Sequence, residues 1–273
     1  MTKALVVGSG AMFGAYGAGV TAELGRQLGS EYFDSIYASS VGVYAASFFA
    51  AGQHEVCEET WRRHVNGRKL INLFRIRNAL KLHYLEKIFQ DRRSFLDIDA
   101  LFCSRVRLTY VLTRLQDGKA VYHMPTHANI FRCMTASAAT PILHGAVRIG
   151  NEMFFDGAFS DPLPVKKALE DGAELVVAVS NKQQGFRIAR SFQVLGIICR
   201  IISKTVSRLV CDFEALVRET EEALNDPRVI VIRPSADLPL RSTIDTDRRR
   251  LNETIDLGIK DARSALEFIR NHK

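Results

Sequence analysis

The sequence lacks the features that mark secreted and membrane-spanning proteins. Its 273 residues contain only five cysteines, and none of them forms a C-x-x-C pair. An odd number of scattered cysteines predicts reduced thiols rather than a disulfide framework. The opening MTKALVVGSG has one lysine and four consecutive apolar residues, too short a run for a signal peptide. No stretch approaches the roughly 18 apolar residues of a membrane span. We therefore expect a cytoplasmic protein.

Internal repeats, low-complexity tracts and composition-biased linkers are also lacking. Hydrophobic residues make up 47% of the chain and charged residues 25%, values typical of a globular protein. We therefore predict one domain spanning residues 1–273, with a core over residues 4–180 and a mainly helical C-terminal extension over about 190–273.

The chain has fewer acidic than basic residues, which gives an excess of positive charge and a formal net charge of +7. This excess indicates either an anionic partner or a basic surface that aids solubility. Basic and apolar residues are interleaved over residues 62–93, and Arg200, Lys204 and Arg208 recur at four-residue steps. Such helices suit the surface of an anionic membrane, but they also occur as core-packed helices with a basic edge. No zinc-finger spacing or ribonucleoprotein motif is present, so nucleic acid is not an expected partner.

The order of the segments predicts an α/β fold with a mostly parallel sheet. ALVVGSG is a short buried strand that ends in glycines, and a helical pattern follows over residues 14–28. FDSIYASS is a second strand, followed by an apolar helix that ends at Gly52. Strands that alternate with helices in this way favour parallel pairing. QDG and GN then mark two hairpins, and AELVVAVS and RVIVIRP are further buried strands.

The glycine-rich stretch GSGAMFGAYGAG lies between the first strand and its helix. Backbone N–H groups in such a loop can hold either a dinucleotide pyrophosphate or the oxyanion of an acyl-transfer intermediate. A dinucleotide site needs an acidic residue at the end of the second strand, whereas Asp34 precedes that strand here. Close packing of helix on sheet is the third explanation for these glycines.

The stretch YASSVGVYAAS contains two adjacent serines at the predicted turn from strand to helix. A nucleophile elbow needs small residues two positions before and two after its serine. Ala38 and Gly42 flank Ser40 in this way, whereas Tyr37 and Val41 flank Ser39. Ser40 is therefore the candidate nucleophile, and a simple N-cap serine is the alternative.

Asp156, in FFDGAFSDPLP, is the candidate base for that serine. Six of the seven histidines precede Asp156, and the seventh is His272 near the C-terminus. The order serine, acid, histidine of α/β-hydrolases therefore fails. A Ser–Asp pair, in which the carboxylate takes the proton, remains available. The alternative is an ordinary turn aspartate before a glycine.

The glycine loop, the elbow serine and the D-G-A triplet, in this order over about residues 5–180, resemble the patatin-like phospholipases. The resemblance implies a three-layer α/β/α fold with a helical C-terminal tail. It also implies hydrolysis of phospholipids or other fatty acyl esters through an acyl-serine intermediate, without a cofactor or metal. Ser40 is then the nucleophile, Asp156 the base, and the N–H groups of Gly10, Ala11 and Met12 the oxyanion donors.

The chain departs from the family pattern at several positions. The family loop usually reads G-G-G-x-R-G. In this chain Ser9 and Ala11 stand at two of the glycine positions, and Phe13 stands at the position of the arginine. Asp161 stands where the family often has asparagine. These departures leave a second hypothesis open, in which the chain is a catalytically silent protein of the same fold that binds lipid or a partner.

Overall fold

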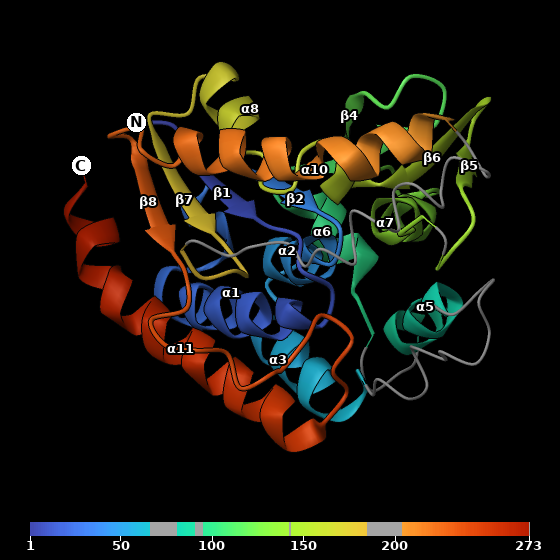
Figure 1. Cartoon of the computed structure of the whole chain (residues 1–273). Coiled ribbons are helices and arrows are strands. Elements are labelled where there is room, and N and C mark those ends of the chain that lie inside the picture. The colour runs from blue at the N-terminus through green and yellow to red at the C-terminus, as the bar shows by residue number, and fades with distance from the viewer. Residues whose placement is uncertain (66–80, 91–94, 142, 185–203, 273) are drawn as a thin grey trace.

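The computed structural model describes residues 1–65, 81–90, 95–141, 143–184 and 204–272. Within these ranges, a mixed sheet of eight strands lies between two layers of helices (Figure 1). The predicted three-layer α/β/α fold is confirmed.

Five of the eight strands run parallel. The strands are β1 (Lys3–Val7), β2 (Ser35–Ser39), β3 (Arg107–Arg114), β4 (Ala120–His123), β5 (Val147–Ile149), β6 (Glu152–Asp156), β7 (Leu175–Val179) and β8 (Val229–Ile232). Their order is β5-β6-β3-β2-β1-β7-β8, and β4 also pairs with β3. The five strands from β3 to β8 in this order are parallel, whereas β6 runs antiparallel to β3. The two predicted hairpins are confirmed as β3–β4 and β5–β6.

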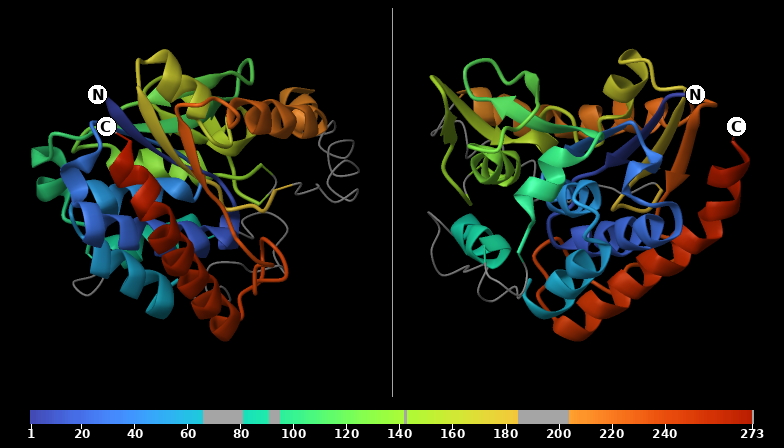
Figure 2. Two further views of the ribbon diagram at one scale, coloured as in Figure 1. Left: turned by 90° about the vertical axis from the view of Figure 1, so that its left-hand side faces the viewer. Right: turned by 180° about the vertical axis from the view of Figure 1, so that it is seen from behind.

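The helices divide between the two faces of this sheet (Figure 2). The described helices are α1 (Gly14–Leu28), α2 (Gly42–Ala50), α3 (His54–Arg63), α5 (Leu82–Gln90), α6 (Ile98–Cys103), α7 (Ile130–Ala138), α8 (Val165–Glu170), α10 (Lys204–Ala223) and α11 (Arg248–Asn271), with the 3-10 turns η1 (Ala11–Phe13), η2 (Ser30–Tyr32) and η3 (Gly157–Phe159). α1, α2, α7 and α11 share the main core on one face. α8 and α10 cover the other face.

The alternation of side chains along β1 explains why both faces are apolar. Leu5 and Val7 belong to the core shared with α1 and α2, whereas Ala4 and Val6 pack under α8. Successive side chains of a strand point to opposite faces, so a central strand needs apolar residues at every position. This is why ALVV is a continuous apolar run.

The order of the strands places a topological switch point at the carboxyl end of β1. From β1 the chain moves to β2 on one side, whereas β7 pairs with β1 on the other. In open parallel sheets, ligands bind at such a switch point, outside the carboxyl ends of the strands. The glycine loop follows β1, Ser39 is the last residue of β2 and Ser40 follows it, so both candidate stretches lie at this point of the sheet.

The C-terminal helix α11 is an integral part of the helical layer. It runs along the outside of α1 (Figures 1 and 2). A Cβ on Gly258 would come within 2.2 Å of the Tyr16 carbonyl oxygen, and a Cβ on Gly19 within 2.2 Å of the Ile255 carbonyl oxygen. Only glycine permits so close a crossing. The predicted helical tail is therefore confirmed, and the same region also contributes β8 to the sheet.

The basic segments of the sequence fall only partly within the described residues. Positions 66–80, 91–94 and 185–203, which include Arg200, lie outside them. In α10, Lys204 and Arg208 are exposed, while Val206 packs inward as part of a small core beneath the helix. The described part of this pattern is thus a core-packed helix with a basic edge.

None of the helices in the described part of the chain combines the length and apolar character needed to cross a bilayer. The four cysteines within this part, Cys57, Cys103, Cys133 and Cys211, are unpaired.

Candidate functional site

Ser40 occupies a strained turn between β2 and α2. Its φ angle is 56°, in the left-handed region, which costs a non-glycine residue about 1–2 kcal/mol. A Cβ on Gly42 would come within 2.5 Å of the Val7 carbonyl oxygen, so only glycine lets α2 start this close to β1. This is the geometry of a nucleophile elbow. The Ser40 hydroxyl makes no capping hydrogen bond to α2, so the N-cap alternative does not describe it.

The side chains of Ser40 and Asp156 meet at the end of the sheet. Ser40 Oγ donates to Asp156 Oδ2 at 3.1 Å, and both residues are buried. Thr140 Oγ1 donates to the same oxygen at 2.8 Å, while the Ala158 N–H donates to Oδ1 at 3.0 Å. Asp156 therefore also caps η3, the role of a turn aspartate, but its other oxygen faces the serine. The structure brings the two predicted residues into hydrogen-bond contact.

The backbone around Asp156 is fixed by β3. Asp156 pairs with Leu112, and Thr113 Oγ1 donates to the Asp156 carbonyl oxygen at 2.7 Å. A Cβ on Gly157 would come within 2.2 Å of the Val111 carbonyl oxygen. The glycine of the D-G-A triplet is thus required by the approach of two backbones, and this approach sets the direction of the carboxylate.

Burial changes the acidity of Asp156. Loss of water around the charged form raises the pKa of the Asp156 carboxyl to about 6. Hydrogen bonds from the Ala158 N–H and from the Thr140 and Ser40 hydroxyls act in the opposite direction, as does the positive charge of Lys182. At pH 7 the carboxyl is mostly ionised, yet it is more basic than an ordinary aspartate. Such a group can accept a proton from a neighbouring hydroxyl.

Two backbone donors of the glycine loop have no acceptor among the residues that the structure describes. The Gly8 N–H donates to the Val179 carbonyl oxygen at 3.0 Å, and the Ser9 N–H donates to the Pro162 carbonyl oxygen at 2.9 Å. Within the described residues, no carbonyl accepts from the N–H groups of Gly10 or Ala11. Ala11 has a φ of 48°, so its backbone is strained like that of Ser40.

The third expected oxyanion donor is already engaged. The Met12 N–H donates at 3.1 Å to the carbonyl oxygen of Thr243, in the segment between β8 and α11. In this conformation, Gly10 and Ala11 are the donors that remain available. Phe13 occupies the position of the family's arginine, and its side chain is buried in the main core.

Sequence reasoning missed several residues that surround the two candidates. Ser137 Oγ accepts from the Ser40 N–H at 3.0 Å and donates to the Val111 carbonyl oxygen at 2.8 Å. Thr140, described above, is the second. Both lie in TASAAT, the small-residue run before Pro141. Only the presence of hydroxyls in that run could have suggested them.

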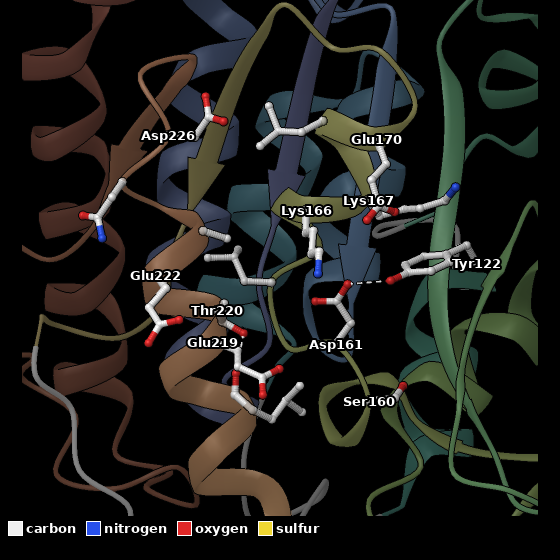
Figure 3. A pocket seen from close by; sticks show the side chains of 15 residues that line it. Tyr122, Ser160, Asp161, Lys166, Lys167, Glu170, Glu219, Thr220, Glu222 and Asp226 are labelled. Atoms are coloured by element: carbon white, nitrogen blue, oxygen red, sulfur yellow. Dashed lines mark hydrogen bonds between the residues drawn. The ribbon is translucent and has the colours of Figure 1, made fainter.

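A separate pocket lies between α8 and α10, on the face of the sheet that these two helices cover (Figure 3). Its volume is about 840 Å³, and its lining includes neither Ser40 nor Asp156. Tyr122 donates to Asp161 Oδ2 at 2.9 Å within this pocket, and burial raises the pKa of Asp161 to about 6. Asp161, the residue that replaces the family's asparagine, thus faces a tyrosine rather than Ser40.

The described residues contain no group of three or more His, Cys, Asp or Glu side chains arranged to hold a metal ion. Ser40 is hydrogen-bonded to the Ser137 hydroxyl and to the Asp156 carboxylate. A carboxylate can accept the proton of a serine hydroxyl, and backbone N–H groups can stabilise an oxyanion.

Three comparisons relate the chain to known proteins. The family model described as patatin-like phospholipase matches residues 5–169. The uncharacterized protein YjjU of Escherichia coli (strain K12) is 26% identical over 182 residues, which cover 64% of this chain and 51% of YjjU. The chain thus spans about half the length of this curated relative.

Among solved structures, the crystal structure of VipD from Legionella pneumophila is similar in fold. The TM-score is 0.53 at 13% identity, and the match covers 97% of this chain and 66% of that one. At this identity the likeness concerns the fold alone.

Proposed function

We propose that this chain, which belongs to the patatin-like phospholipase family, is a serine acyl hydrolase that cleaves fatty acyl esters with a Ser40–Asp156 dyad. One observation carries the proposal: the hydroxyl of a serine in a strained elbow donates to a buried carboxylate at 3.1 Å. Family membership gives the substrate class, phospholipids or other fatty acyl esters.

The first half of the reaction forms an acyl-serine. Asp156 Oδ2 takes the proton of the Ser40 hydroxyl as Oγ attacks the carbonyl carbon of the ester. The carbonyl oxygen becomes an oxyanion, which the N–H groups of Gly10 and Ala11 stabilise. As the intermediate collapses, the C–O bond of the ester breaks and Asp156 returns the proton to the leaving alcohol. Loss of one oxyanion donor typically lowers such a rate by roughly a hundred- to a thousandfold.

The second half releases the acid. Asp156 takes a proton from a water molecule, whose oxygen attacks the acyl-serine carbonyl. The oxyanion forms in the same loop, the bond to Ser40 Oγ breaks, and the serine recovers its proton. The proposed reaction uses only the dyad, the loop and water.

The proposal includes the wider expectations drawn from the sequence. We take residues 1–273 as one catalytic domain, in which α11 packs on α1 and β8 extends the sheet. A cytoplasmic location and contact with an anionic membrane surface remain predictions. The rival hypothesis is a silent lipid- or partner-binding protein. Phe13 is buried in the main core, and within the described residues no carbonyl accepts from the N–H groups of Gly10 or Ala11; both observations support the enzyme.

Release of acid from esters distinguishes the two hypotheses. We would measure p-nitrophenyl octanoate hydrolysis and fatty acid release from phosphatidylglycerol and lysophosphatidylcholine, with Asp156→Asn as the matched variant. The enzyme hypothesis predicts turnover that the substitution removes without unfolding the protein. Binding of vesicles without turnover of any of these esters would favour the silent protein.

A further inference from the structure

Asn181 is a buried polar residue to which the proposed reaction assigns no role. It follows the carboxyl end of β7, the strand beside β1 at the switch point of the sheet. Its relative exposure is 1%. A buried amide needs hydrogen-bond partners, and those partners indicate what the side chain serves.

Both hydrogen bonds of the Asn181 side chain go to the glycine loop. Asn181 Nδ2 donates to the Gly8 carbonyl oxygen at 2.7 Å and to the Ser9 carbonyl oxygen at 3.3 Å. The Ser9 carbonyl belongs to the same peptide unit as the Gly10 N–H, and the Gly8 carbonyl belongs to the preceding unit. Because a peptide unit is planar, fixing the Ser9 carbonyl also fixes the direction of the Gly10 N–H.

Sterics hold the side chain in this place. A Cβ on Gly10 would come within 2.9 Å of Asn181 Cβ, and a Cβ on Gly17 within 2.5 Å of Asn181 Oδ1. The side chain is thus wedged between the loop and α1. Its Oδ1 has no hydrogen-bond partner within the described residues, which is unfavourable for a buried oxygen. We therefore attribute the presence of a buried asparagine at this position to the hydrogen bonds that its Nδ2 donates to the loop.

Backbone hydrogen bonds hold the glycine loop on both sides of Gly10 and Ala11. Gly8 and Ser9 are held by their N–H groups as well, through Val179 and Pro162. Met12 is held through Thr243 on the far side. Only the two N–H groups between these anchors are without acceptors within the described residues. Asn181 is the side chain that braces the segment immediately before them.

We infer that Asn181 is a positioning residue, which holds the glycine loop so that the N–H groups of Gly10 and Ala11 point at the oxyanion. The inference rests on the proposed function. It concerns a side chain that does not touch substrate, and its effect is on the transition state, in which the oxyanion forms. Substrate binding before that point depends on it much less.

The test compares Asn181→Asp, Asn181→Ala and the control Asn225→Asp in the full-length protein. Asn181→Asp keeps the shape but removes both donated hydrogen bonds, and Asn181→Ala serves if the charge prevents folding. Asn225 is exposed, so its variant makes the same chemical change without touching the loop. We would measure kcat and KM with p-nitrophenyl octanoate and the affinity of an octyl trifluoromethyl ketone, whose serine adduct carries an oxyanion.

We expect kcat to fall by between about tenfold and about a hundredfold while KM changes little. The ketone should lose affinity by a factor similar to the loss in kcat/KM. A purely structural role would lower the melting temperature and the folded fraction. It would leave kcat and the affinity for the ketone unchanged per folded molecule. That result, or equal losses in Asn225→Asp, would overturn the inference.

Hydrogen exchange provides a readout that does not depend on activity. Loss of the Asn181 bonds should speed amide exchange in a peptide covering residues 8–13, and leave α11 unaffected. If wild-type protein hydrolyses none of the esters, the proposed function fails, but exchange still decides whether Asn181 braces the loop. Unchanged exchange in both Asn181 variants would contradict the bracing itself.

Discussion

Ser40 and Asp156 lie 116 positions apart in the chain, and their side chains meet at 3.1 Å. Two parallel strands and one antiparallel strand make this contact. β2 ends one residue before Ser40, β3 pairs with β2, and β6 pairs with β3 and ends at Asp156. The contact is therefore a property of the sheet.

The rate should depend on pH through Asp156. The carboxyl must be ionised to accept the serine proton, and its pKa is raised to about 6. We expect kcat/KM for p-nitrophenyl octanoate to rise with pH, to half its maximum near pH 6, and then to level off. A flat profile between pH 5 and pH 8 would exclude this carboxyl as the base.

Thr140 should set the position of that titration. Its hydroxyl donates to Asp156 Oδ2 at 2.8 Å and lowers the pKa of Asp156. Thr140→Val removes the hydroxyl at nearly constant volume, so the acid limb of the profile should move to higher pH. Thr140→Ser keeps the hydroxyl and should leave the limb in place. Identical limbs in wild type and Thr140→Val would contradict the assigned hydrogen bond.

Ionisation of Asp156 should also affect the stability of the protein. It should lower stability, whereas it raises the rate. The pKa of Asp156 in the folded state, about 6, lies above the ordinary aspartate value of 3.8, so the folded state binds the proton more tightly. The Asp156 contribution to stability is then lost as pH rises from about 4 to about 6. The asparagine of the Asp156→Asn variant does not titrate. The melting temperature of the variant minus that of wild type should therefore increase as pH rises across this range. A constant difference would mean that burial does not raise this pKa. Asp161 also titrates there but is common to both proteins.

Backbone strain at Ser40 can be measured directly. Alanine and serine carry the same penalty at a φ of 56°, whereas glycine does not. We expect Ser40→Gly to be more stable than Ser40→Ala by about 1 kcal/mol in urea unfolding. Equal stability of the two variants would show that this turn is not strained.

The crossing of α1 and α11 supports the whole domain. A Cβ at position 258 would lie 2.2 Å from the Tyr16 carbonyl oxygen, and backbone cannot yield as a side chain can. Gly258→Ala should cost about 1–3 kcal/mol, the usual range for overpacking. Gly145→Ala is the matched control, because nothing lies within 4 Å of its Cβ. Similar melting temperatures for the two variants would mean that α11 is only loosely attached.

Local patterns predicted much of this architecture. ALVV, the glycines after it and the QDG and GN turns suffice to predict the strands and hairpins, because side-chain alternation and turn chemistry are local properties. The spacing of Ala38 and Gly42 around Ser40 likewise predicts an elbow, and resemblance to the family predicts its partner, Asp156.

Contacts that depend on register could not be predicted in this way. That Thr140 shares an oxygen with Ser40, that Asn181 reaches the Gly8 carbonyl and that Thr243 engages the Met12 N–H all follow from how distant segments pack. Each involves a common polar residue in an ordinary local context. Nothing in the neighbouring sequence distinguishes these residues from other surface or turn residues.

The most direct test of the dyad is covalent labelling of its serine. We would treat wild type, Ser39→Ala, Ser40→Ala and Asp156→Asn with a fluorophosphonate probe and map the modified peptide by mass spectrometry. The Ser39 hydroxyl is buried without a hydrogen-bond partner within the described residues, so its removal should leave labelling intact. The account predicts a label on Ser40 in wild type and Ser39→Ala and none in the other two variants. Equal labelling of wild type and Asp156→Asn, or no label on Ser40 in folded wild-type protein, would contradict it.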